Sequence, residues 1–428
     1  MLIWLLQRSE PTPHDNEGKQ RLLRTGIMAE ALSRAGHDVM WWTSTFDHYN
    51  RRQRFNCHQR KEVTENYSIQ YVKGCGYKRN ISFARLLENI EVAKNFTKLA
   101  ECELLLPDII VASIPTAELA SEAIRFAKSR YIPVILDVRD LWPDFLFESV
   151  PMLLKPLVYL GLLPLVRKTR WAFRHADAVV GLTGDFVDWG LCYAGRKVDK
   201  QDRVFPMGYI KRCLSDRERI TGNAFWKFYN VGVNDGILNV IFVGTMSRSF
   251  DLSVVLQAAR LLENRGASVR FIICGDGEQF TTLQKMSVGL DNVIMPGWIN
   301  DIQIRTLLEH AHVGLAPYIA SPNYTKNLPN KPAEYFSAGL AIATSLATGP
   351  LVNLINKHDC GFSYLNNADL LVASLNSYLD EIRLCEVQKN AMLVFESFLD
   401  GGKIYPDMIT YFEKMVHDFC KRRPASQS

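Results

Sequence analysis

Short apolar runs alternate with stretches of helical periodicity along this chain of 428 residues, and this pattern constrains its fold more than any other feature. The segment 21–35 carries apolar residues at helical spacing and stops at Gly36. Four runs in the first half predict buried strands, at 2–6, 39–43, 107–113 and 133–138. Strands that alternate with helices in this way indicate βαβ units and a parallel sheet.

A second series of the same kind begins at Leu238, with strands expected at 238–243, 269–274, 292–295, 313–317 and 340–344. A chain of this length is too long for one ordinary core and fits two domains. We therefore predict an α/β fold with two Rossmann-like domains that face each other across a cleft. The expected boundaries are an N-terminal domain at 1–210, a linker at 211–237, a C-terminal domain at 238–403, and a last helix at 404–428 that returns to the N-terminal domain.

Composition excludes several classes of protein. The net charge of +5 is too small to indicate a nucleic-acid partner. The nine cysteines form no CxxC pair and no zinc-ligand spacing, so we expect reduced thiols, no metal and a cytoplasmic protein. The first eight residues lack the pattern of a signal peptide, and no run of 18 apolar residues occurs. The polar stretch 50–66 is expected to be a loop, and we assign no chemistry to it.

The stretch 323–339 carries the sharpest chemical pattern. Pro332 suits a first helical turn, so Lys331 is expected at a helix N-terminus, where free N–H groups favour an anion such as a diphosphate. Glu334, one turn later, can accept hydrogen bonds from ribose hydroxyls. The alternative is that Lys331 and Glu334 form only a solvated pair on one helix face. Two loops of phosphate-binding type in the same half, 244–251 and 274–278, favour the first interpretation.

This order of segments resembles the retaining glycosyltransferases of the GT-B fold, specifically family 4, from Leu2 to about Tyr364. The best matches are Asp137-Val-Arg-Asp-Leu-Trp-Pro143 and Leu328-Pro-Asn-Lys-Pro-Ala-Glu-Tyr-Phe-Ser-Ala-Gly339. Supporting matches are Val243-Gly-Thr245, Ile273-Cys-Gly-Asp-Gly277 and Pro296-Gly-Trp298. The resemblance implies a nucleotide-sugar donor held by the C-terminal domain and an acceptor held by the N-terminal domain.

The resemblance also implies residue roles on the donor side. Arg248 and Lys331 would contact the diphosphate, Glu334 the ribose, and Gly297-Trp298-Ile299 the base. The remaining donor positions that it assigns are glycines in three loops, Gly18, Gly244 and Gly275. The chain departs from the family at Lys326, eight residues before Glu334, where members often carry a first glutamate near the donor sugar.

On the acceptor side, residues 137–143 follow an apolar strand directly, so their side chains should reach the ligand edge of the sheet. Asp140 is the candidate for contact with the transferred sugar or the acceptor hydroxyl, and is counted with Arg248 and Lys331 as catalytic. Asp137, Arg139 and Trp142 complete the acceptor side. The alternative is that Asp137 and Asp140 are turn and cap residues.

The segment 151–174 is rich in leucine, contains five cations and has no acidic residue. This composition is typical of helices that lie on an anionic membrane surface, here the inner face of the plasma membrane, where a lipid-linked or glycan acceptor would be met. A buried helix with a basic end is the alternative. Pro156 and Pro164 are expected to break any single long helix.

Taken as a whole, the sequence predicts sugar transfer with retention, in which electrostatic stabilisation of the leaving diphosphate replaces a covalent nucleophile. No carboxylate cluster for a divalent metal is evident, so we expect neither metal nor cofactor. A role in polysaccharide or lipid-linked glycan assembly follows from the resemblance. Two alternatives stay open, a nucleotide-sugar epimerase of the same fold and a catalytically silent nucleotide-binding subunit. A dehydrogenase is disfavoured because no GxGxxG follows the first strand.

Overall fold

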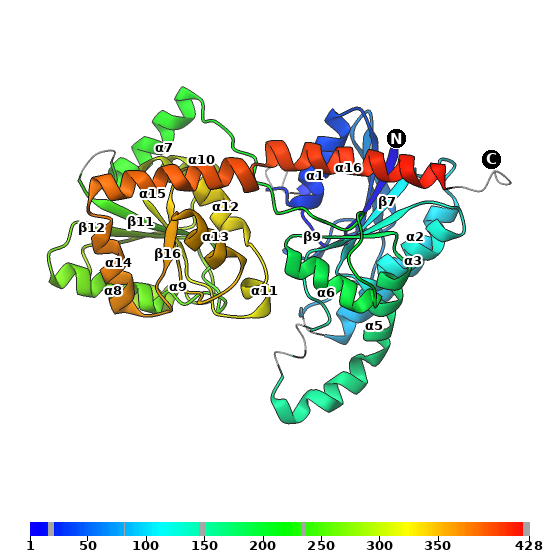
Figure 1. Ribbon diagram of the computed structural model, residues 1–428, viewed down its shortest axis with the longest axis horizontal. Helices are drawn as coiled ribbons and strands as arrows, with labels where there is room; N and C mark the ends of the chain where they lie inside the picture. The colour runs from blue at the N-terminus through cyan, green and yellow to red at the C-terminus, as the bar shows by residue number, and fades with distance from the viewer. Residues whose placement is uncertain (16–20, 81, 145–146, 148–149, 233–235, 423–428) are drawn as a thin grey trace. The chain divides into compact units, whose positions relative to one another are not determined.

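The computed structural model describes residues 1–15, 21–80, 82–144, 147, 150–232 and 236–422. The chain divides into two compact α/β units (Figure 1). Unit 1 comprises Met1–Phe205 together with Lys403–Ser428, and unit 2 comprises Pro206–Gly402. The candidate nucleotide-sugar residues of the second half therefore all belong to unit 2.

Unit 1 is built on an eight-stranded sheet of order β10-β9-β8-β7-β1-β2-β6-β5. Its strands are β1 (Leu2–Leu6), β2 (Asp38–Ser44), β5 (Gln59–Thr64), β6 (Tyr67–Val72), β7 (Ile109–Ile114), β8 (Val134–Val138), β9 (Ala178–Gly181) and β10 (Arg203–Val204). Neighbouring strands are parallel except at β5, which pairs antiparallel with β6. Its helices are α1 (Arg24–Arg34), α2 (Phe83–Glu101), α3 (Ala117–Lys128), α5 (Lys155–His175) and α6 (Gly184–Ala194).

The alternation of side chains along β1 shows how unit 1 covers both faces of its sheet. Ile3 and Leu5 join a core that also contains Met28 of α1. Trp4 points to the opposite face, where its ring lies 6.3 Å from Phe96 of α2 and 5.3 Å from Phe126 of α3. Because consecutive side chains of a strand point to opposite faces, a continuous apolar run is what a sheet covered on both sides requires.

Unit 2 contains a six-stranded parallel sheet of order β13-β12-β11-β14-β15-β16. Its strands are β11 (Leu238–Val243), β12 (Val269–Cys274), β13 (Val293–Gly297), β14 (Val313–Ala316), β15 (Ala341–Thr344) and β16 (Gly361–Ser363). The helices between and after them are α8 (Ser253–Asn264), α9 (Phe280–Met286), α10 (Asp301–His310), α11 (Pro322–Thr325), α12 (Asn330–Ser337), α13 (Pro350–His358), α14 (Ala368–Ser377) and α15 (Glu381–Val394).

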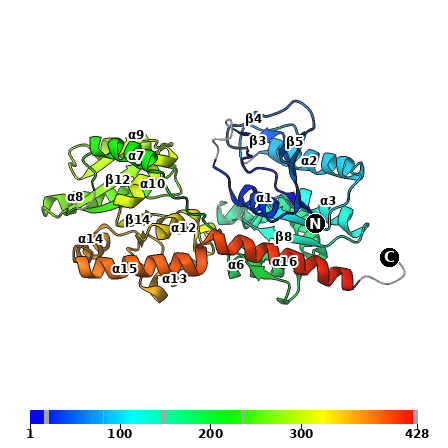
Figure 2. The same ribbon diagram turned by 90° about the horizontal axis from the view of Figure 1, so that it is seen from above.

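Three expectations about local structure are wrong. The expected loop 50–66 contains β4 (Arg52–Gln53), which pairs with β3 (Phe46–Asp47), and the edge strand β5 (Figure 2). The expected linker 211–237 contains helix α7 (Asp216–Phe228), which begins with a capping box of Ser215 and Glu218. Pro164 lies inside α5 without ending it, and Pro156 lies in its first turn, where the backbone N–H groups have no partner within the helix.

The last helix, α16 (Gly401–Lys421), packs with unit 1. Tyr405, Met408 and Phe412 are buried in the same core as Ile3 and Leu5. Among the helices that the structure describes, none combines the length and apolarity needed to cross a bilayer.

Candidate functional site

Gly244 and Lys331 lie against each other at the carboxyl-terminal edge of the unit 2 sheet. Gly244 follows β11 and has a φ of +156°. A Cβ atom at this glycine would lie 2.3 Å from Lys331 Nζ, so the ammonium group rests directly on bare backbone. Lys331 is the second residue of α12, and its Nζ lies 4.8 Å from the centre of the Phe250 ring. A cation, a helix N-terminus and a glycine backbone thus converge where a sheet of this kind binds ligands.

The loops after the next two strands close around the same edge. Gly275 and Gly297 also have positive φ angles, of +132° and +80°. Gly275 donates its N–H to the Gly297 carbonyl at 2.8 Å, and Gly244 donates to Cys274 at 3.0 Å. A Cβ atom at Gly275 would lie 1.9 Å from the Gly244 carbonyl oxygen, so only glycine allows the two loops to approach so closely.

Arg248 belongs to the loop after β11 but is far more open than Lys331. Its side chain is 88% exposed, and its Nε lies 3.6 Å from Glu278 Oε2. An exposed ion pair of this length contributes little to stability. The Arg248 guanidinium is therefore held loosely, beside a site whose glycines are held tightly.

The other donor candidates lie around this edge. Glu334 is half-buried, one turn after Lys331 on α12, and Lys326 is exposed. Tyr335 anchors the helix because its hydroxyl accepts a hydrogen bond from the Val243 N–H at 3.0 Å. Trp298 is 74% exposed, whereas the side chain of Ile299 is buried in the core of unit 2. Gly18 lies outside the described residues.

In unit 1, the carboxylate of Asp137 is completely buried between two guanidinium groups. Arg24 Nε donates to it at 3.0 Å and Arg139 Nε at 2.8 Å. Burial by itself would raise the pKa of Asp137, but the charges of Arg24 and Arg139 hold it below its ordinary value. Arg139 also pairs with Glu10, which follows β1. Asp137 and Arg139 thus hold β8 to the start of α1, as parts of a closed network.

Asp140 and Trp142 lie further along the same loop, beside another arginine, Arg85. The Arg85 guanidinium lies 5.1 Å from the centre of the Trp142 ring and 5.9 Å from that of Tyr77. The indole N–H of Trp142 is buried and makes no hydrogen bond to any described residue. Burial, followed by the charge of Arg8, lowers the pKa of Arg85, while Asp140 opposes that shift.

Sequence reasoning missed a group of charges at this edge, the buried Arg8, Glu88 and Glu118 and the half-buried Arg85. Arg8 Nη1 lies 3.7 Å from Glu88 Oε1, and the Arg8 side chain is only 2% exposed. Burial raises the pKa of Glu118, in the first turn of α3. Arg8 comes two residues after β1 and Glu118 four residues after β7, so a search for charges just past each strand would have found both.

One group of possible metal ligands lies within the described residues. In this group, Cys75, Glu88 and Glu91 bring possible ligand atoms within 4.8 Å of one another. Burial and the two carboxylates raise the pKa of the Cys75 thiol to about 11, so it is protonated at neutral pH. Glu88 already accepts hydrogen bonds from Ser44 Oγ and Gly76 N, both at 2.6 Å.

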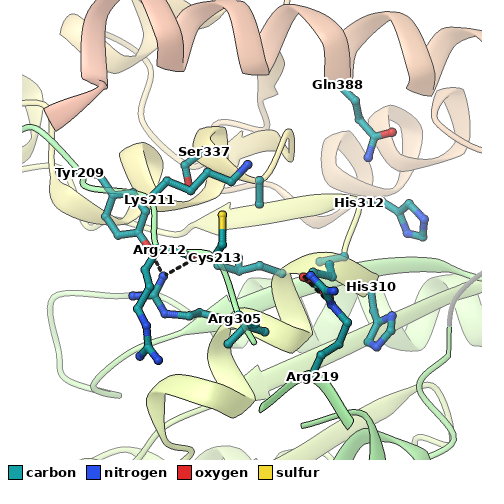
Figure 3. Close-up of a pocket in the computed structure, with 15 residues that line it drawn as sticks. Tyr209, Lys211, Arg212, Cys213, Arg219, Arg305, His310, His312, Ser337 and Gln388 are labelled. Carbon is teal, nitrogen blue, oxygen red and sulfur yellow. Dashed lines mark hydrogen bonds and ion pairs between the residues drawn. The ribbon is translucent and has the colours of Figure 1, made fainter. Parts of the chain in front are cut away.

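A recess of about 470 Å³ lies at the opposite, amino-terminal edge of the unit 2 sheet (Figure 3). Its walls include His312, directly before β14, and Ser337, at the end of α12. Two arginines in it are already paired, Arg212 with Glu218 and Arg219 with Glu309. The recess contains none of the residues predicted to bind the nucleotide sugar.

The sequence of unit 2 matches a known family. Residues 238–381 match the model of the family described as glycosyl transferases group 1. This stretch is therefore similar to the domain that defines that family. It contains the glycine loops, Arg248, Lys331 and Glu334, and its match supports a glycosyltransferase. No curated protein matches the sequence.

Solved structures establish the fold of the whole chain. Sucrose-phosphate synthase from Thermosynechococcus elongatus is 15% identical, with a TM-score of 0.69 over 97% of this chain and 99% of that one. HepE from Anabaena, in complex with UDP-glucose, is 15% identical, with a TM-score of 0.63 over 97% of this chain and 100% of that one. WaaG, a glycosyltransferase involved in lipopolysaccharide biosynthesis, is 13% identical, with a TM-score of 0.63 over 97% of this chain and 99% of that one. The predicted GT-B fold, with two Rossmann-like domains, is confirmed.

Proposed function

We propose that this protein is a retaining, family 4 glycosyltransferase that moves a sugar from a nucleotide donor to an acceptor hydroxyl. The observation that carries the proposal is the contact of the Lys331 ammonium with the Gly244 backbone at the N-terminus of α12, inside the stretch that matches the glycosyl transferases group 1 family. The complex of the similar HepE with UDP-glucose supports a nucleotide-sugar donor.

We propose that catalysis depends on electrostatic stabilisation of the leaving diphosphate and uses no covalent nucleophile. Departure of the diphosphate places negative charge on the leaving oxygen, next to Lys331, Arg248 and the free N–H groups of α12. Groups already fixed in place stabilise that charge without reorganising. Asp140, on unit 1, contacts the transferred sugar or the acceptor hydroxyl. Retention then follows from attack of the acceptor on the face that the diphosphate leaves.

Alanine variants test the donor site. Lys331→Ala and Arg248→Ala should each lower kcat by about 30- to 1000-fold, the effect of removing a preorganised electrostatic partner, while donor binding falls less. Glu334→Gln should mainly raise the KM for the donor, since ribose contacts change little during reaction. Lys389→Ala, an exposed lysine on α15, is the matched control. Wild-type kcat in both Lys331→Ala and Arg248→Ala would place the diphosphate elsewhere.

The reaction is proposed to need no metal or cofactor, because protein cations and helix N–H groups neutralise the diphosphate. A chelator should therefore leave the rate of transfer nearly unchanged. Loss of transfer on chelation, with recovery on adding a divalent cation, would contradict this part of the proposal.

A silent nucleotide-binding subunit is the second candidate, and Lys326 favours it because this position often carries a glutamate near the donor sugar in the resembling family. Incubation of the purified chain with labelled nucleotide sugars separates the candidates. The transferase releases nucleotide and transfers or hydrolyses the sugar, an epimerase changes the sugar but keeps it on the nucleotide, and the silent subunit does neither.

The acceptor is proposed to be lipid-linked or glycan, met at the cytoplasmic face of a membrane during polysaccharide or lipid-linked glycan assembly. The support is an apolar arm formed by the 3-10 turn Met152–Leu154 and the first turns of α5, and its exposed side chains are Met152, Leu153, Leu154, Leu157, Tyr159 and Leu160. Leu153 is 93% exposed, and Figure 1 shows the start of α5 extending away from the unit 1 sheet. Arg167, Arg170 and Arg174 are exposed further along the same helix. Leucines beside exposed cations suit an anionic bilayer.

Vesicle binding tests the membrane contact. Replacing Leu153 and Leu157 by serine should weaken binding to anionic vesicles about tenfold or more, because each buried leucine contributes roughly 1.5–3 kcal/mol. Replacing Arg167, Lys168 and Arg170 by glutamate should have a similar effect, with donor binding unchanged. The control replaces two exposed apolar residues of unit 2, Ile220 and Phe228, by serine. The contact is refuted if the wild type ignores anionic vesicles at low salt, where attraction is strongest.

A further inference from the structure

A basic recess of about 560 Å³ lies in unit 1, at the carboxyl-terminal ends of β2 and β6. We call it the hairpin recess, because the β3–β4 hairpin forms one wall and residues 75–79 form the other. Ligands of parallel α/β sheets bind at this edge. The recess is formed by the beginning of the polar stretch 50–66, to which we assigned no chemistry above, together with the loop after β6.

Its rim carries four cations, Arg51, Arg52, Lys78 and Arg79, and none of the described residues that line it is a carboxylate. All four side chains are exposed, and none forms an ion pair with a residue that the structure describes. Exposed cations are usually interspersed with carboxylates, whose charge offsets theirs. Here the charge is left uncompensated on both sides of one cavity.

The hairpin is built to hold two of these cations in place. Asp47 accepts hydrogen bonds from the backbone N–H groups of Tyr49 and Asn50, at 2.9 and 3.0 Å, which shapes the turn before Arg51. The Arg51 guanidinium then donates to the Lys78 carbonyl at 3.1 Å, which ties the hairpin to the opposite wall.

The floor of the recess is aromatic. The rings of Phe46 and Tyr77 lie 4.7 Å apart, and both residues are buried. Gly76 has a φ of +73°, and a Cβ atom there would lie 2.7 Å from the Phe46 ring. The glycine therefore keeps the floor flat against the backbone. The two rings support the recess from beneath and offer little open surface, since Phe46 is 3% and Tyr77 5% exposed.

The positive field extends from the recess to the candidate catalytic loop. Arg85 lies over both Tyr77, on the floor, and Trp142, two residues after Asp140. His48 Nδ1 lies 2.6 Å from the Tyr77 hydroxyl. Burial and then the charges of Arg85, Arg8 and Arg51 lower the pKa of His48 to about 4, so it is neutral at neutral pH. Arg85 therefore links the floor of the recess to the loop that carries Asp140.

We propose that the hairpin recess binds the phosphate-bearing end of the acceptor, with Arg51, Arg52, Lys78 and Arg79 around the phosphate. Arginine forks match the oxygens of a phosphate in pairs, and lysine adds a point charge. This inference rests on the proposed function, because it assigns the ligand as the acceptor. A phosphate monoester or diphosphate is the shared chemistry, and its source is either an isoprenyl-linked sugar or a soluble sugar phosphate.

Calorimetry on the full chain without donor tests the recess directly, with citronellyl diphosphate and glucose 1-phosphate as probes. At least one probe should bind, more weakly as salt is added, while uncharged citronellol should bind much less. Tighter binding of citronellyl diphosphate identifies a lipid-linked source, and tighter binding of glucose 1-phosphate a soluble one. Failure of both probes to bind at low salt would overturn the proposal.

Variants locate the bound probe. Arg51→Ala/Arg52→Ala and, independently, Lys78→Ala/Arg79→Ala should each weaken binding about tenfold. Lys197→Ala/Lys200→Ala removes the same charge from the loop before β10, at the opposite edge of the sheet, and should bind like wild type. Lys331→Ala should also bind normally. Equal weakening in the Lys197/Lys200 variant would show a diffuse charge effect, and loss only in Lys331→Ala would place the probe at the donor site. Either result would overturn the proposal that the hairpin recess binds the probe.

This experiment separates the inference from the proposed function. If the probes bind at the hairpin recess but no nucleotide sugar supports transfer, the proposed function fails while the anion site remains. If transfer occurs but neither pair of alanines affects probe binding, the recess is refuted and the proposed function remains.

Discussion

At the scale of single residues, the two units use charge in opposite ways. In unit 2, the positive charges of Lys331 and Arg248 lie at the ligand edge of the sheet. In unit 1, Arg24 and Arg139 form ion pairs with the buried carboxylate of Asp137. Sequence reasoning placed Lys331 and Gly244 together because both follow buried strands of one sheet. It could not foresee the Arg8–Glu88 contact, since these residues are 80 positions apart and neither belongs to a motif.

The buried Asp137 yields a prediction for stability. Asp137→Asn removes the buried carboxylate charge that Arg24 and Arg139 share, and should lower the free energy of unfolding by roughly 3–5 kcal/mol at pH 7. The pKa of Asp137 is lowered in the folded state, so its contribution is present above its unfolded pKa of about 3.9 and is lost as pH falls through the lower folded value.

Urea unfolding at pH 7 and at stepwise lower pH measures this difference, with the exposed Asp188→Asn on α6 as the control. The gap between wild type and Asp137→Asn should narrow only below about pH 4. A variant as stable as wild type at pH 7 would show that the network does not hold unit 1 together.

At the scale of elements, buried strands were the easiest feature to predict. The strands at 238–243 and 269–274 were placed to the residue, since each is a run of mostly apolar side chains covered on both faces. β5 was missed because it is an edge strand whose side chains alternate between half-buried and exposed, and its sequence QRKEVT is mostly polar. Helix α7 carried a signal that was overlooked, the Ser-x-x-Glu capping box.

The glycine loops give a prediction at the same scale. Gly275→Ala should lower the free energy of unfolding by roughly 1–3 kcal/mol from backbone strain alone, because its φ of +132° disfavours a side chain. It should also weaken donor binding, since the new Cβ pushes the Gly244 loop away. Gly184→Ala at the start of α6, where a Cβ atom meets no other atom within 4 Å, is the control. Thermal unfolding with and without a nucleotide-sugar donor measures both effects, and equal behaviour of the two variants would refute the close approach.

At the scale of the whole molecule, unit 1 depends on the far end of the chain. Phe412 of α16 is fully buried in the unit 1 core, so Phe412→Ala should lower the free energy of unfolding by roughly 3–5 kcal/mol. Phe228→Ala removes an 80% exposed ring of α7 and should have little effect. Urea titration compares the two, and similar midpoints would mean that α16 is dispensable for unit 1.

Because α16 completes the core of unit 1, the order in which the chain is synthesised affects when each unit can finish folding. Unit 2 is one continuous segment, Pro206–Gly402, and every residue of it has been polymerised before Lys403. Unit 1, although it begins the chain, lacks part of its core until α16 leaves the ribosome. A nascent chain released too early would therefore carry a folded unit 2 and an N-terminal sheet with one apolar face only partly covered, by α1 without α16. Such exposed apolar surface recruits chaperones or aggregates. The domain made first is thus the last to be completed.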